Sequence, residues 1–271
     1  MIHSSFASHG LSTLFAERTQ KFRTACRGFA ALPANSGFSA LACYNERVQP
    51  TFRSAAHRLR SELCDGQITP AIFSAALAQI AQSDRDPWLD LLWDVDEIPF
   101  DDPELPRGCV PYLPCPAASV LHALEQASVT SADVFVDVGS GLGRAAFLAH
   151  LKTGASCIGL EIQRSLARAA QERADWAGLG QLQFVQGDAT EMVRSFTNGT
   201  VFFLYCPFSG IRLQRFLDGL EHVARMQPIR VCCVDMPPLE TSWLARLPSP
   251  SSDVDVYRST FTGESSRSQL R

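Results

Sequence analysis

The second half of the chain alternates short apolar runs with longer amphipathic stretches. In the amphipathic stretches, apolar residues recur every three or four positions, which is the period of a helix buried on one face. Strands are expected over residues 134–136, 182–185, 201–206, 229–234 and 254–261 and in a run ending at Glu161, and helices over residues 117–127, 164–177 and 211–226, with a short one ending at Phe196. This alternation predicts an α/β fold with a doubly wound, mainly parallel sheet.

The first hundred residues carry a succession of helical patterns instead. Helices are expected over residues 10–32, 51–64, 70–80 and 88–92. The third is marked most clearly, because Thr69 is a suitable N-cap residue and Pro70 suits the first helical position. We therefore expect residues 1–93 to form a helical N-terminal cap.

Between the cap and the α/β region the composition changes. Residues 94–116 are rich in prolines and acidic residues, which is typical of an extended connection. The acids suit either a solvated linker or the wall of a site for a cationic substrate. We expect a linker over residues 94–116 and a domain over residues 117–265. The cap and the linker near Tyr112 are expected to roof the ligand site.

Length, charge and cysteine usage limit the class of protein. A net charge of −4 over 271 residues argues against a general nucleic-acid binder, which neutralises phosphates with Lys and Arg. No apolar run approaches the roughly 20 residues that a membrane span needs. The 9 cysteines form no CxxC pair, which indicates free thiols in a reducing compartment. We therefore expect a cytoplasmic protein without a membrane span or a bound metal.

The first strand of the α/β region ends in Asp137 and runs into three glycines, Gly139, Gly141 and Gly143. Glycines permit a tight turn with positive φ and let a ligand approach the bare backbone. The next strand ends in Glu161, and an acid at that position accepts hydrogen bonds from both hydroxyls of a ribose. The pattern therefore predicts a ribose-bearing ligand on a glycine-rich loop.

Two cofactors fit this pattern. Residues 141–146 satisfy the G-x-G-x-x-A dinucleotide fingerprint, and Glu161 lies at the matching spacing, so an NAD(P)-dependent oxidoreductase is one alternative. Two features favour a different cofactor. Asp137 and Gly139 precede the fingerprint, and a second acid, Asp188, ends the third strand, where it suits an adenine amino group.

The motifs DVGSGLG (residues 137–143), GLEI (159–162) and GDA (187–189), in this order, resemble the class I S-adenosylmethionine-dependent methyltransferases. The resemblance covers roughly residues 117–236. Together with Tyr112-Leu113-Pro114, the motifs are most similar to the non-SET histone lysine methyltransferases. The resemblance implies a Rossmann-like fold with an antiparallel strand near the sheet edge, S-adenosylmethionine as cofactor, and methyltransferase activity (EC 2.1.1.-).

The resemblance also implies a role for individual residues. Asp137 would support the loop and face the amino group of the donor, and Glu161 would hold the ribose. Asp188 would bound one edge of the adenine. The remaining residues expected at the cofactor are Tyr112, the loop residues Gly139, Ser140, Gly141 and Gly143 beneath the methionine part, and Ile162 and Ala189 beside the adenine.

The acceptor side is less clear from the sequence. Amino-group methyltransferases often carry Asn or Asp, two prolines and an aromatic residue after the fourth strand, whereas this chain has Tyr205-Cys206-Pro207-Phe208. Tyr205 and Phe208 are the candidate catalytic residues, and no general base can be named. A catalytically inactive cofactor-binding or interaction protein is therefore a further alternative. The expected acceptor is a small molecule or a protein side chain, and a nucleic acid is disfavoured by the charge.

Overall fold

The computed structural model describes residues 50–95, 98–102, 104–249 and 253–261. The helix expected over residues 10–32 lies outside these ranges. Within them, no helix is both long and apolar enough to cross a membrane.

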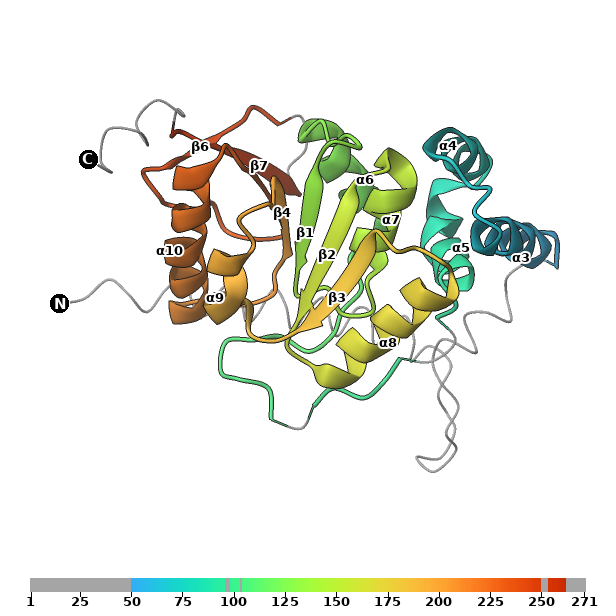
Figure 1. The fold of residues 1–271 in the computed structure, drawn as a ribbon, viewed down its shortest axis with the longest axis horizontal. Coiled ribbons are helices and arrows are strands. Elements are labelled where there is room, and N and C mark those ends of the chain that lie inside the picture. The colour runs from blue at the N-terminus through green and yellow to red at the C-terminus, as the bar shows by residue number, and fades with distance from the viewer. Residues whose placement is uncertain (1–49, 96–97, 103, 250–252, 262–271) are drawn as a thin grey trace.

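The centre of the molecule is a sheet of seven strands in the order β3-β2-β1-β4-β5-β7-β6 (Figure 1). The first five strands pair in parallel, whereas β7 is antiparallel to both of its neighbours. The antiparallel strand expected near the edge is therefore present. The strands are β1 (Val134–Val138), β2 (Ser156–Glu161), β3 (Leu182–Gln186), β4 (Val201–Tyr205), β5 (Arg230–Val234), β6 (Leu244–Arg246) and β7 (Val254–Ser259).

Helices cover both faces of this sheet. On one face lie α6 (Ala117–Gln126), α7 (Arg144–Thr153) and α8 (Arg164–Trp176). On the other lie α9 (Ala189–Met192), a 3-10 turn over Val193–Ser195, and α10 (Ile211–Met226). The fold is thus the predicted Rossmann-like methyltransferase fold with a mainly parallel, doubly wound sheet.

The two faces explain why the strand sequences are apolar throughout. Phe135 and Phe203 pack into the core beneath α6 and α7, while their neighbours Val136 and Phe202 pack into the core beneath α10. All four side chains are fully buried. A strand covered on both faces needs an apolar residue at every position, so the continuous runs mark parallel strands in the middle of the sheet.

The N-terminal helices α3 (Pro50–Cys64), α4 (Pro70–Ala78) and α5 (Arg85–Leu92), with a 3-10 turn over Gln82–Asp84, lie beside α7 and α8 (Figure 1). Helix α4 begins as expected, since Thr69 Oγ1 accepts a hydrogen bond from Ile72 N at 3.3 Å. These helices contribute Phe73 and Trp88 to the same apolar core as α7. They pack on α7 and not directly on the strands, and among the described residues before α6 it is the linker that crosses the carboxyl ends of the strands.

A buried ionic cluster docks α5 against the start of α7. Arg144, the first residue of α7, forms ion pairs with Asp90 and, at 2.9 Å, with Asp86. Asp90 is 6% exposed, so burial raises its pKa, and the guanidinium of Arg144 opposes the rise. Trp93 donates from Nε1 to Leu142 O at 2.7 Å and stacks on Phe147. The N-terminal helices are therefore tied to the loop that precedes α7.

This docking makes a stability prediction. Asp90→Ala leaves the Arg144 charge buried without its closest partner, and we expect it to lower the free energy of unfolding by about 3 kcal/mol. Glu172→Ala removes one side of the exposed Arg168–Glu172 pair on α8 and should cost no more than about 0.5 kcal/mol. Urea denaturation of both variants measures the two free energies of unfolding. An equal decrease in both variants would contradict a stabilising role for the buried ion pair between Arg144 and Asp90.

Candidate active site

The glycine-rich loop lies at the carboxyl end of β1. Gly139, Gly141 and Gly143 have φ angles of 78°, 55° and 85°, a region that other residues adopt only with strain. The amides of Gly139 and Ser140 donate to Leu160 O in β2 at 2.8 and 3.1 Å. The expected tight turn is therefore present and is tied to the neighbouring strand.

Each of the three glycines also faces a closely packed side chain. A Cβ added to Gly139 would lie 2.8 Å from Pro207, one added to Gly141 would lie 2.1 Å from the ring of Tyr112, and one added to Gly143 would lie 2.4 Å from Phe184. The glycines are thus required by close packing as well as by their φ angles. This packing also brings Tyr112 and Pro207, expected near the cofactor and the acceptor, to the same loop.

Glu161 ends β2 and points its carboxylate at the loop. Oε2 accepts from Gly141 N and Oε1 from Gln163 N, each at 2.8 Å, and the residue is 5% exposed. Burial raises the pKa of this carboxyl, and the backbone N–H groups oppose the rise. A carboxylate offers about four acceptor positions, so Glu161 keeps acceptor capacity for a ribose.

Asp137 is the other buried acid of the site. It is 3% exposed, and its Oδ2 has no hydrogen-bond partner among the described residues. Burial raises its pKa to about 7; the backbone N–H of Ala146 opposes this rise and the Glu161 carboxylate adds to it. The buried Oγ of Ser140 likewise has no partner within the described ranges. Unpaired buried oxygens are costly, and a ligand that donates hydrogen bonds, such as an ammonium group, suits them.

Asp188, expected beside the adenine, follows β3 and has a structural role in the described fold. It is the N-cap of α9, where its Oδ1 accepts from Thr190 N at 2.9 Å and from Thr190 Oγ1 at 2.7 Å. Its Oδ2 pairs with Arg212 of α10. Burial raises the pKa of Asp188, but the hydrogen bonds from Thr190 and Arg212 outweigh burial and hold the pKa below its ordinary value. Ala189 beside it is buried.

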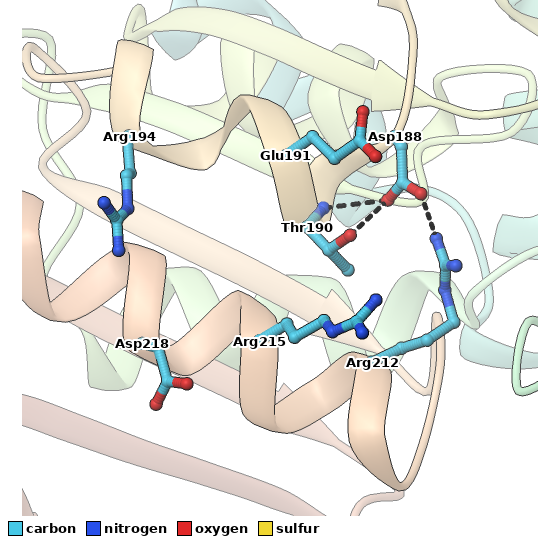
Figure 2. A pocket seen from close by; sticks show the side chains of 7 residues that line it. All are labelled: Asp188, Thr190, Glu191, Arg194, Arg212, Arg215 and Asp218. Carbon is cyan, nitrogen blue, oxygen red and sulfur yellow. Dashed lines mark hydrogen bonds and ion pairs between the residues drawn. The ribbon is translucent and has the colours of Figure 1, made fainter.

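An open hollow of about 320 Å³ lies next to Asp188, between α9 and α10 (Figure 2). Figure 2 shows Arg212 reaching Asp188 across one end of it. The hollow does not include the glycine-rich loop. Its lining is mostly charged and consists of Asp188, Thr190, Glu191, Arg194, Arg212, Arg215 and Asp218.

The Tyr205–Phe208 segment leaves β4 with a strained backbone. Cys206 has a φ of 43°, and its Sγ donates to the carbonyl of Asp235 at 2.7 Å. Asp235, at the end of β5, has a φ of 54°. Phe208 is 7% exposed and packs on Phe216 with ring centroids 5.4 Å apart. Phe208 therefore belongs to the core under α10, and Tyr205, at the end of β4, is only partly buried.

The linker passes over the same end of the sheet. Gly108 O accepts from Ser209 N at 3.0 Å, and Cys109 forms a bridge with Phe208, both just after β4. Further along, the ring of Tyr112 covers Gly141, and burial raises the pKa of its phenol. In Figure 1 this teal-green segment runs below the carboxyl ends of the strands. The linker therefore contacts both the glycine-rich loop and the segment after β4.

Three residues near the site were not expected from the sequence: Arg144, Gln163 and Arg212. Each acts through a partner far along the chain, such as Asp90 for Arg144 and Asp188 for Arg212. Local periodicity and motif spacing carry no signal for such contacts. Ile162, which was expected beside adenine, is partly buried, and its carbonyl accepts from Gln186 Nε2 at 3.3 Å.

Comparison with known proteins agrees with this architecture. Residues 135–236 match a family model described as a methyltransferase domain. That range begins in β1 and ends just after β5, so it contains the glycine-rich loop, Glu161, Asp188 and Tyr205. None of the curated proteins matches the sequence significantly.

Solved methyltransferase structures are similar to part of this chain. An RNA methyltransferase from Salinibacter ruber, solved with S-adenosyl-L-homocysteine, is 29% identical over 54% of this chain and 92% of its own, with a TM-score of 0.43. A putative methyltransferase from Escherichia coli is 15% identical over 61% of this chain and 92% of its own, with a TM-score of 0.45. Because these TM-scores are below 0.5, the assignment depends on the family match and the sheet topology. Residues 135–236 are thus similar in sequence to a methyltransferase domain.

Proposed function

We propose that this protein transfers a methyl group in line from S-adenosylmethionine to a nucleophile of its acceptor, releasing S-adenosylhomocysteine. The observation that carries the proposal is the meeting of the glycine-rich loop with the buried Glu161 carboxylate at the carboxyl ends of β1 and β2. In open α/β sheets, ligands bind outside the carboxyl ends of the strands.

The proposed donor site uses the residues that the sequence motifs indicated. Glu161 would accept from the ribose hydroxyls, and the unpaired Oδ2 of Asp137 would face the amino group, directly or through water. Gly139, Ser140, Gly141 and Gly143 would lie beneath the methionine part, and Tyr112 would cover it. Ile162, Asp188 and Ala189 would bound the adenine, with the Asp188 carboxylate shared with Thr190 and Arg212.

Bound S-adenosylmethionine supplies an electrophilic methyl group on a sulfonium, which is already a good leaving group. The chain's own task is then to align the acceptor with the methyl carbon and to exclude water. Pro207 packs on Gly139, so the strand end that follows Tyr205 lies next to the donor loop. Strained backbone is common at functional positions, and Cys206 and Asp235 place it at the ends of β4 and β5. We propose that the acceptor binds there, beside Tyr205.

A small molecule and a protein side chain are the proposed acceptors. The resemblance of the motifs to the non-SET histone lysine methyltransferases supports a protein side chain, and the net charge of −4 disfavours a nucleic acid. Strand order opposes the oxidoreductase alternative. The dinucleotide fold has the parallel order 3-2-1-4-5-6, whereas here the antiparallel β7 lies between β5 and β6.

Calorimetric titration separates the two cofactors. The protein should bind S-adenosylmethionine and S-adenosylhomocysteine with a micromolar dissociation constant (Kd) and should not bind NAD(H). Micromolar binding of NAD(H) with no binding of the methyl donor would overturn the proposal.

Glu161→Ala should weaken binding of S-adenosylhomocysteine by about 2 kcal/mol or more. The substitution removes charge-assisted hydrogen bonds to both ribose hydroxyls and releases the Gly141 amide from its acceptor. Calorimetry measures the loss, and Glu172→Ala on the exposed face of α8 is the matched control. An affinity unchanged in Glu161→Ala would show that the acid does not hold the ribose.

Asp137→Asn should change how stability depends on pH. The folded pKa of about 7 lies above the unfolded value near 3.9, so the wild-type protein loses stability as pH rises through this interval. Between pH 5 and pH 7.5 we expect the wild-type free energy of unfolding to fall about 2 kcal/mol further than that of the variant. Urea denaturation at both pH values measures this, and parallel changes in the two proteins would show that Asp137 stays ionised throughout. Saturating S-adenosylmethionine should reduce the wild-type loss, because an ammonium beside Asp137 favours the carboxylate.

A further inference from the structure

Gln163 occupies an unusual place at the start of α8. It is the N-cap residue of that helix, where Ser, Thr, Asp or Asn is preferred, and its side chain makes no capping hydrogen bond. It is nevertheless 2% exposed. A buried primary amide needs partners for both its oxygen and its nitrogen, and here neither partner comes from the helix.

Both partners of the Gln163 amide come from the linker, about sixty residues earlier in the chain. Oε1 accepts from Asp102 N at 2.8 Å, and Nε2 donates to Asp101 Oδ1 at 2.9 Å. Only one orientation of the amide satisfies both contacts, since the Asp102 amide donates and the Asp101 carboxylate accepts. The Gln163 side chain therefore holds Asp101 and Asp102 of the linker in one position relative to the start of α8.

These contacts belong to a closed circuit around the proposed donor site. Asp101 Oδ1 also accepts from Tyr112 N at 2.8 Å, and the Tyr112 ring covers Gly141. Gly141 N donates to one oxygen of Glu161, and Gln163 N donates to the other. The linker, the glycine-rich loop and the acid at the end of β2 are thus joined through one residue.

We propose that Gln163 is a positioning residue that latches the linker over the donor site and couples that closure to Glu161. The proposal rests on the function proposed above. The backbone N–H of Gln163 orients the Glu161 carboxylate, which is assigned to the ribose. The Gln163 side chain holds Asp101 and Asp102, so that Tyr112 stays on the glycine-rich loop. Gln163 acts through these partners. Residues 98–102 and 104–112 form the latched part of the linker.

Two variants open the latch from opposite sides. Gln163→Leu keeps the volume and the backbone N–H to Glu161 but removes both side-chain hydrogen bonds. Asp101→Ala removes the carboxylate that accepts from Gln163 Nε2 and from Tyr112 N, and because Asp101 is exposed, its truncation leaves no cavity in the core. Asp101→Asn retains the Oδ1 acceptor and should keep the latch. Glu104→Ala is the matched control, because it removes an exposed acid of the same linker that takes no part in these hydrogen bonds.

The first measurement is hydrogen exchange of the ligand-free protein. The Asp102 and Tyr112 amides should exchange at least about 10-fold faster in Gln163→Leu and in Asp101→Ala than in the wild type, because their acceptors are lost or released. Asp101→Asn and Glu104→Ala should exchange at the wild-type rate. Wild-type protection in both opening variants would overturn the latch.

The second measurement is the release rate of S-adenosylhomocysteine, followed by stopped-flow fluorescence. We expect about 10-fold faster release in Gln163→Leu and Asp101→Ala, with unfolding midpoints close to the wild type. Unchanged release in both opening variants, with exchange accelerated, would overturn the coupling to the donor. If the wild type binds no S-adenosylhomocysteine while exchange follows the expected pattern, the proposed function fails and the latch itself stands.

Discussion

The site depends on the hydrogen bonds that the buried Glu161 carboxylate accepts from two backbone amides. One oxygen takes the Gly141 amide and the other takes the Gln163 amide, so this acid joins the loop after β1 to the helix start after β2. A buried carboxylate is stable only when its oxygens are satisfied, and the backbone amides supply that satisfaction at both strand ends. The Glu161 carboxylate therefore fixes the geometry of the glycine-rich loop. It is also the group that we assign to the ribose hydroxyls.

Around this carboxylate, elements distant in sequence converge on one short loop. Tyr112 arrives from the linker, Pro207 from the end of β4 and Phe184 from β3, and each fills the space that a side chain on a loop glycine would need. Trp93 of the N-terminal region holds the carbonyl of Leu142 in the same loop. The loop is thus held by packing from several segments, and the buried Asp137 Oδ2 and Ser140 Oγ have no hydrogen-bond partner among the described residues.

The N-terminal helices support the domain from one face. Arg144 begins α7 directly after the glycine-rich loop, and its ion pairs with Asp86 and Asp90 fix α5 there. A buried pair of this kind contributes little net stability but makes separation of its partners costly. The described part of the linker, rather than these helices, contacts the glycine-rich loop, and the proposed closure of the donor site depends on residues 98–102 and 104–112 and on the side chain of Gln163.

Periodicity and motif spacing determined most of the fold and the centre of the site. Helix α10 has the predicted bounds, and the acids Asp137, Glu161 and Asp188 lie at strand ends as predicted, because strand and helix periods are local properties of the chain. The three-residue strand β6 was not predicted, since so short a segment has no period and forms only by pairing with β7. The tertiary structure alone decided that Phe208 packs into the core, that Asp188 is shared with Arg212, and that Gln163 holds the linker. Each of these depends on a contact between distant segments, and the side chains themselves do not encode their partners.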